Sequence, residues 1–165
     1  MMALRTIAIG LTLLLGWMLA APAGWAASID WPAQPSHLQL ETPYGTLGVR
    51  TSEYVYESRL QIDNTDVQPA VRGLLNITYA FNLPTASVAL VSISSGDNQC
   101  PMSYRWVTLK KDSHTVSPAF GSCSEQIKVS ARHGALTLQT PNTEKADKID
   151  VYVYDGKTIK LRSKP

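Results

Sequence analysis

Leu75-Asn76-Ile77-Thr78-Tyr79-Ala80-Phe81-Asn82-Leu83 alternates in polarity, and the apolar run Val88-Ala89-Leu90-Val91-Ser92-Ile93 follows it closely. Alternation with a period of two residues is typical of a strand that buries one face. We therefore expect one buried face to hold Leu75, Ile77, Tyr79, Phe81 and Leu83. The second run is apolar on nearly both faces, which favours a central strand covered on both sides.

Similar short runs continue to the C-terminus, with turn signals between them. Arg132-His133-Gly134 is expected to turn one hairpin, and Asp155-Gly156 separates two alternating runs, a pattern typical of hairpin turns. Only residues 142–148 are compatible with even one helical turn. The sequence therefore predicts an all-β fold, an antiparallel β-sandwich or small barrel of about 8–10 strands. This single domain is expected over residues 47–165, after an irregular, proline-containing leader over residues 27–46.

The N-terminus has the pattern of an export signal. Arg5 precedes an apolar run from Ile7 to Ala21, and Gly24-Trp25-Ala26 has the small-x-small form of a cleavage site. A retained membrane anchor is the alternative, but the run is shorter than the roughly 20 residues that a spanning helix needs. We expect residues 1–26 to be a cleaved signal peptide, with a periplasmic or secreted product and no stable membrane insertion.

The two cysteines, Cys100 and Cys123, both lie in the expected mature chain. An exported protein meets an oxidising compartment, so these residues are predicted to form a disulfide that encloses 22 residues. A catalytic thiol and a metal site are the competing interpretations. No histidine pair lies near the cysteines, which disfavours zinc, and we expect no metal and no cofactor.

A disulfide would join two polar loops at one end of the sheet. The residues it would gather, our first candidate binding surface, are Asp97, Asn98, Arg105, Trp106, Phe120, Ser122, Ser124 and Glu125. The alternative is that the disulfide only stabilises the domain and that the polar residues only form turns. A second candidate surface is Tyr152 with Tyr154, which lie on the outer face if Ile149, Val151 and Val153 are core.

The cysteine region also carries a resemblance. Gly96-x-x-x-Cys100-Pro101, an aromatic-rich strand, then Phe120-Gly121-x-Cys123-Ser124 and a Lys-Val strand resemble small uncharacterised exported proteins of Gram-negative bacteria with a single cystine. The match covers roughly residues 90–140, and its motifs are mostly turn and cystine chemistry. The resemblance implies a periplasmic setting and a cystine, and it transfers no catalytic residue.

The charge pattern restricts the partner classes. The mature chain would carry 14 basic and 13 acidic residues, and this balance argues against nucleic acid as the main partner. Lys157, Lys160, Arg162 and Lys164 alternate along the C-terminal run and are interpreted as a solvated sheet edge.

No nucleophile–base motif occurs, so we expect no enzyme and no catalytic residues. The leading hypothesis is a non-catalytic periplasmic binding protein whose partner is another envelope protein. An inhibitor or immunity-type partner of an envelope-acting protein would fit. The alternatives are a structural accessory subunit of an envelope or secretion assembly, and a small hydrolase or small-molecule binder.

Signal cleavage is directly testable. Intact-mass measurement of the exported protein should find a chain that begins at Ala27, within a few residues. Ala26→Asp should shift or block the cut, because signal peptidase requires a small residue there. A full-length chain that still begins at Met1 in the exported fraction would contradict the prediction.

Overall fold

The computed structural model describes residues 30–52, 57–145 and 147–164, so the predicted signal peptide lies outside the described residues. All described strands pair antiparallel, in two sheets. The larger has the order β1-β2-β3-β5-β6-β7-β8, with β4 against β3, and the smaller has the order β12-β11-β10-β9. The bounds are β1 Gln39–Thr42, β2 Gly45–Thr51, β3 Ser58–Ile62, β4 Thr65–Asp66, β5 Arg72–Leu83, β6 Ala86–Ser94, β7 Met102–Lys110, β8 Ser113–Val116, β9 Lys128–Arg132, β10 Ala135–Pro141, β11 Ile149–Tyr154 and β12 Ile159–Lys164.

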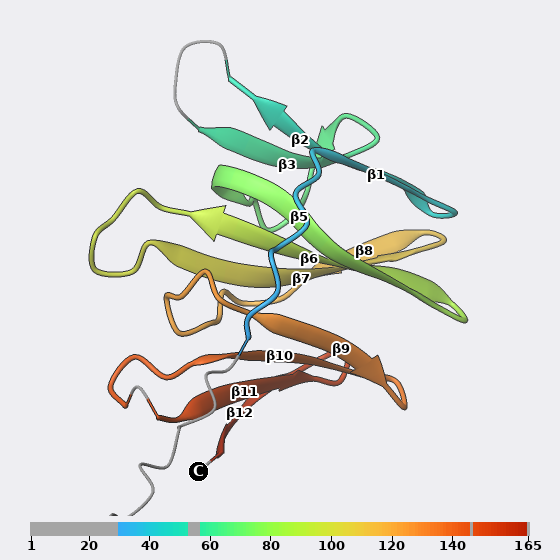
Figure 1. The fold of residues 1–165 in the computed structure, drawn as a ribbon. Coiled ribbons are helices and arrows are strands. Elements are labelled where there is room, and N and C mark those ends of the chain that lie inside the picture. Colours follow the sequence, from blue (N-terminus) through green and yellow to red (C-terminus); the bar gives the residue numbers. More distant parts are fainter. Residues whose placement is uncertain (1–29, 53–56, 146, 165) are drawn as a thin grey trace, which may run out of the picture.

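The strands stack in three layers (Figure 1). An upper layer of β1–β3 continues through β5 into a middle layer of β5–β8, and β9–β12 form a lower layer. The upper core, between the first two layers, contains Leu47, Leu60, Val67, Val71, Leu75, Ile77, Ala89, Val91, Val107 and Leu109. The lower core, between the last two layers, contains Val88, Leu90, Tyr104, Trp106, Ile127, Leu136, Leu138 and Tyr154.

Strand β6 is covered on both faces, as its composition predicts. Val88 and Leu90 belong to the lower core, whereas Ala89 and Val91 belong to the upper core, and all four are at most 2% exposed. Its neighbours β5 and β7 complete the ladder on both edges. Because neither face meets water, this strand has apolar residues at consecutive positions rather than at alternate ones.

The single buried face predicted for β5 is wrong. A β-bulge shifts the register between Ile77, which pairs with Val91, and Tyr79, which pairs with Leu90. Thr78 is the extra residue, and its hydroxyl donates to the Leu90 carbonyl at 3.0 Å. One inserted residue exchanges the two faces of a strand. Leu75 and Ile77 therefore enter the upper core, while Tyr79, Phe81 and Leu83 pack against the lower core.

The leader is shorter than predicted, because residues 39–42 and 45–46 belong to β1 and β2. Pro43 and Tyr44 form the turn of this hairpin, so Pro43 and Gly45 mark a turn rather than irregular chain. His37 exchanges backbone hydrogen bonds with Ile77 of β5, at 3.0 and 2.9 Å. His37 precedes β1, so this bridge brings the start of β1 against β5. Strand β3 also pairs with β5, at Arg72 and Gly73, so β1–β3 and β5 nearly close into a barrel.

Both predicted hairpin turns are confirmed. His133 and Gly134 join β9 to β10 with φ angles of 50° and 76°, the left-handed conformation that a tight two-residue turn requires. Asp155 opens the β11–β12 turn, where its carboxylate accepts the backbone N–H groups of Thr158 and Lys157. These hydrogen bonds lower the pKa of Asp155 to about 2.

The bulge can be tested by deletion. Removing Thr78 should abolish the cooperative unfolding transition, because Tyr79, Phe81 and Leu83 would then face the wrong layer. Thr78→Val keeps the residue count and loses one hydrogen bond, so it should cost about 1 kcal/mol. Urea unfolding followed by circular dichroism measures both variants, and equal stability of the two would contradict this account.

Candidate functional site

The predicted disulfide between Cys100 and Cys123 is present, with 4.7 Å between the two Cα atoms. Cys100 belongs to the loop between β6 and β7, and Cys123 belongs to the segment between β8 and β9. The bond therefore brings the two predicted loops together. We call residues 95–101 and 120–126, joined by this bond, the cystine loops.

Several non-covalent links also fix the second cystine loop. Phe120 and Tyr104 exchange backbone hydrogen bonds of 2.8 and 2.9 Å. The Tyr104 hydroxyl donates to the Ser124 carbonyl at 2.9 Å, and the Gln34 amide donates to that hydroxyl and to the Glu125 carbonyl. Burial raises the pKa of Tyr104 to about 12, so the hydroxyl keeps its proton to a higher pH than an exposed tyrosine does.

Gly121 is required by this packing. Its φ of 124° lies where residues with side chains are strained. A Cβ at this position would also lie 2.9 Å from the Tyr104 ring. The chain can pass this closely over the aromatic ring only with glycine at this position.

Both cystine loops carry exposed polar side chains. Of the predicted binding residues, Asp97, Asn98 and Glu125 are exposed. The first loop is held by its own side chains, because Asp97 Oδ1 accepts the Gln99 N–H at 2.9 Å and the Ser95 hydroxyl donates to the Cys100 carbonyl. Such local hydrogen bonds fix the backbone that carries the exposed groups.

Two other predicted site residues are buried. Trp106 is fully buried in the lower core, and its indole N–H has no partner among the described residues. Ser122 is 6% exposed, and its hydroxyl is hydrogen-bonded to that of Thr140 at 2.8 Å. Neither side chain can reach a partner, so their assignment to a binding surface is wrong. The alternation of β7 turns Trp106 inward, and the cystine places Ser122 beneath the loop surface.

Arg105 lies on the opposite face of β7 from Tyr104 and Trp106, so it does not join the cystine loops. Its guanidinium donates to the Ser117 carbonyl at 2.9 Å. It lines a separate hollow of about 380 Å³ with residues of β5 and β6.

Phe120 and Ser124 are half-buried and hold the loop rather than project from it.

The outward face predicted for Tyr152 and Tyr154 is also wrong. Tyr154 is 3% exposed and stacks on Trp106, with 6.0 Å between ring centroids. Tyr152 is half-buried against Phe120 at 5.4 Å. The aromatic side chains of β11 match the buried tryptophan, so Val153 and its neighbours at alternate positions take the outer face.

A hollow of about 400 Å³ adjoins the cystine loops. The leader forms one wall with residues 31–36, and Glu125 and Gln126 form part of another. Met102, at the start of β7, contributes an apolar surface. The sequence does not show this hollow, because the leader reaches the loops only through tertiary contacts such as that of Gln34 with Tyr104.

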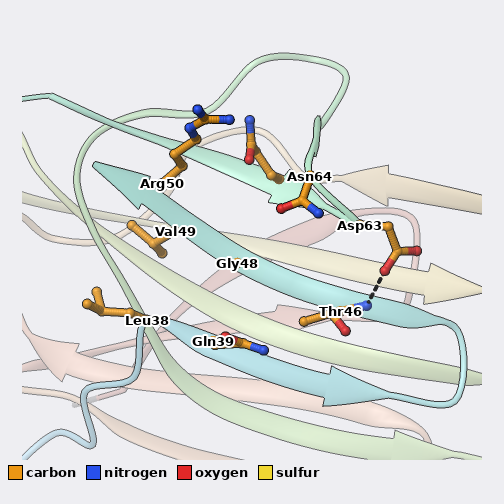
Figure 2. Close-up of a pocket in the computed structure, with 9 residues that line it drawn as sticks. Leu38, Gln39, Thr46, Gly48, Val49, Arg50, Asp63 and Asn64 are labelled. Carbon is orange, nitrogen blue, oxygen red and sulfur yellow. Dashed lines mark hydrogen bonds between the residues drawn. The ribbon is translucent and has the colours of Figure 1, made fainter. Parts of the chain in front are cut away.

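A second hollow that the sequence analysis missed lies on the outer face of the upper layer (Figure 2). It measures about 540 Å³, and Arg50, Asp63 and Asn64 are among its polar lining. Asp63 Oδ1 accepts the Thr46 N–H at 2.9 Å, which fixes one wall. The Asp63-Asn64 dipeptide, typical of a tight turn, was the one sequence signal for it.

The histidines do not form a catalytic group in the described chain. His37 lies at the bridge to β5, His114 accepts the Gln68 N–H at 3.1 Å, and His133 lies in the β9–β10 turn. Among the described residues, no three His, Cys, Asp or Glu side chains are arranged to hold a metal ion. The described chain contains no helix that is long and apolar enough to cross a membrane.

Comparison with known proteins gives no relative. No family model, no curated protein and no solved structure matches this chain.

The cystine loops give a stability prediction. The Cys100→Ser/Cys123→Ser double variant should lose about 3 kcal/mol of unfolding free energy, because the unfolded chain regains the freedom of the closed loop. Urea unfolding measures the loss, and the wild-type chain treated with dithiothreitol should match the variant. A variant as stable as the oxidised wild type would contradict the prediction.

Proposed function

We propose that this protein is a non-catalytic binding protein that acts outside the cytoplasm and contacts another protein through the cystine loops. The disulfide supports the compartment, because such bonds persist in oxidising environments. An inhibitor or immunity-type partner of an envelope-acting protein is the form of this function that fits a small, rigid domain.

The observation that carries the proposal is the fixed, concave arrangement around Glu125. The residue lines the hollow of about 400 Å³, and its loop is held by the cystine, by the Tyr104 hydroxyl and by the Gln34 amide. A surface that is ordered before binding loses little conformational entropy when the partner arrives. Rigid loops on a β scaffold are also a common location of binding residues.

The chemistry of the exposed groups suggests what the partner presents. Asp97 and Glu125 carry negative charge on the two cystine loops, and Asn98 and Gln126 add amide donors and acceptors. Met102 and the leader residue Pro32 line the hollow with apolar surface. A partner lysine or arginine would fit, with its aliphatic stem in the hollow and its charge near Glu125.

Affinity capture tests the proposal. The tagged protein, purified from the envelope fraction of its source organism, should retain one stoichiometric partner. Asp97→Asn with Glu125→Gln removes both charges and keeps the hydrogen-bond acceptors that shape the loop, so it should release the partner.

The matched control is Asp112→Asn with Glu144→Gln, which removes the same charge from exposed residues of other loops. This variant should retain the partner as the wild type does. The proposal fails if the wild type captures no stoichiometric partner, or if the cystine-loop variant captures it as well as the control does.

A further inference from the structure

The outer face of the lower layer is strongly basic. Leu136 and Leu138 of β10 point into the lower core, so the alternate residues of this sheet form its outer face, away from the other layers (Figure 1). Among the residues whose side chains the structure describes, the strand register places four cations on this outer face. We call them the basic face: Lys128 and Arg132 on β9, and Lys160 and Arg162 on β12.

Among the described residues, no cation of this face forms an ion pair. Asp150 is the one acidic residue within β9–β12, and it is 6% exposed on the inner side, where it accepts the Asn142 amide. Asp155 lies in the β11–β12 turn, with its carboxylate held by backbone N–H groups. These hydrogen bonds lower its pKa most, and the charge of Lys160 lowers it further, so this carboxylate partly balances Lys160. Within the described residues the recorded ion pair joins Arg59 to Asp66, on the upper layer.

The cations form two parallel rows with neutral polar groups between them. The rows occupy the two edge strands of the sheet, three strand spacings or about 14 Å apart. Lys160 and Arg162 are two positions apart in their row, or about 7 Å. Ser130 pairs with Thr137, and Gln139 lies beside them, so hydroxyl and amide groups lie beside the first row.

Trp31 adds a flat apolar surface at the border of the basic face. Lys128 lies over its ring, 5.6 Å from the centroid, and the indole is half-exposed. The contact leaves the charge of Lys128 in place, because the ring is neutral.

We propose that the basic face binds an anionic polysaccharide that bears a carboxylate or phosphate on its repeating unit. Such a polymer supplies regularly spaced negative charges for the two rows and hydroxyl groups for Ser130, Thr137 and Gln139. Through Trp31 this site adjoins the hollow beside Glu125, but its cations lie on β9 and β12, and it does not depend on the function proposed for the cystine loops.

Other anionic partners match the face less well. A membrane surface would require apolar side chains that project past the cations on this face. Val151, in register between Gln139 and Arg162, is only 8% exposed, and Leu161, which is 56% exposed, pairs with Tyr152 and so lies on the opposite face of the sheet. Single-stranded nucleic acid is bound on several aromatic platforms, and the described strand residues of this outer face include none.

The test measures binding of the processed protein to polygalacturonate, which carries one carboxylate on each sugar, by isothermal titration calorimetry at low salt. Lys160→Gln with Arg162→Gln should weaken binding about tenfold. Lys128→Gln with Arg132→Gln should act similarly, since both rows contact the polymer. If the loss of edge cations makes the Lys160→Gln/Arg162→Gln variant aggregate, the Lys128→Gln/Arg132→Gln variant still tests the proposal.

The matched control is Lys110→Gln with Lys111→Gln, which removes two exposed charges at the end of β7 and in the following turn and should leave binding unchanged. Neutral dextran should not bind. The proposal is overturned if the wild type does not bind polygalacturonate, or if the control variant weakens binding as much as the β9 and β12 variants. Tighter binding to phosphatidylglycerol vesicles, polyglutamate or oligothymidylate of equal charge would also overturn it.

Discussion

The burial of β6 on both faces organises the whole structure. A strand with no solvent-exposed face needs an apolar layer on each side, and here the upper and lower layers provide them. Strand β5 serves both cores as well, but it does so by exchanging faces at the Thr78 bulge. The first half of β5 therefore holds the upper layer, and the second half holds the lower one. The middle layer connects two cores that would otherwise be separate units.

The lower core connects this architecture to the cystine loops. Trp106 stacks on Tyr154 and on Phe120, and Phe120 is paired through its backbone with Tyr104. The second cystine loop is thus fixed both by aromatic packing against the lower core and by the disulfide. The backbone of the cystine loops, which carries the exposed carboxylates of Asp97 and Glu125, therefore has little conformational freedom. This rigidity favours recognition of one partner shape over many.

Charge is divided between the outer layers in a way that the net charge conceals. The upper layer combines Arg59 with Asp66 and places Asp63 beside its hollow. The lower layer presents cations on its outer face and turns its strand carboxylate, Asp150, inward. A nearly balanced chain can therefore carry one face with a strong local field.

The sequence alone determined the all-β class, the two-sided burial of β6, the hairpin turns and the pairing of Cys100 with Cys123. These features follow from local periodicity, turn chemistry and the presence of a single cysteine pair. The tertiary structure decided which face each side chain takes. One inserted residue, Thr78, reverses the later half of β5, and no local pattern reveals a bulge whose register depends on the partner strand. Tyr154 is inward because Trp106 lies opposite it, and the cations of β9 and β12 share one face because β10 and β11 set their register. Such contacts join residues that are distant along the chain, so their consequences appear only once the layers are packed.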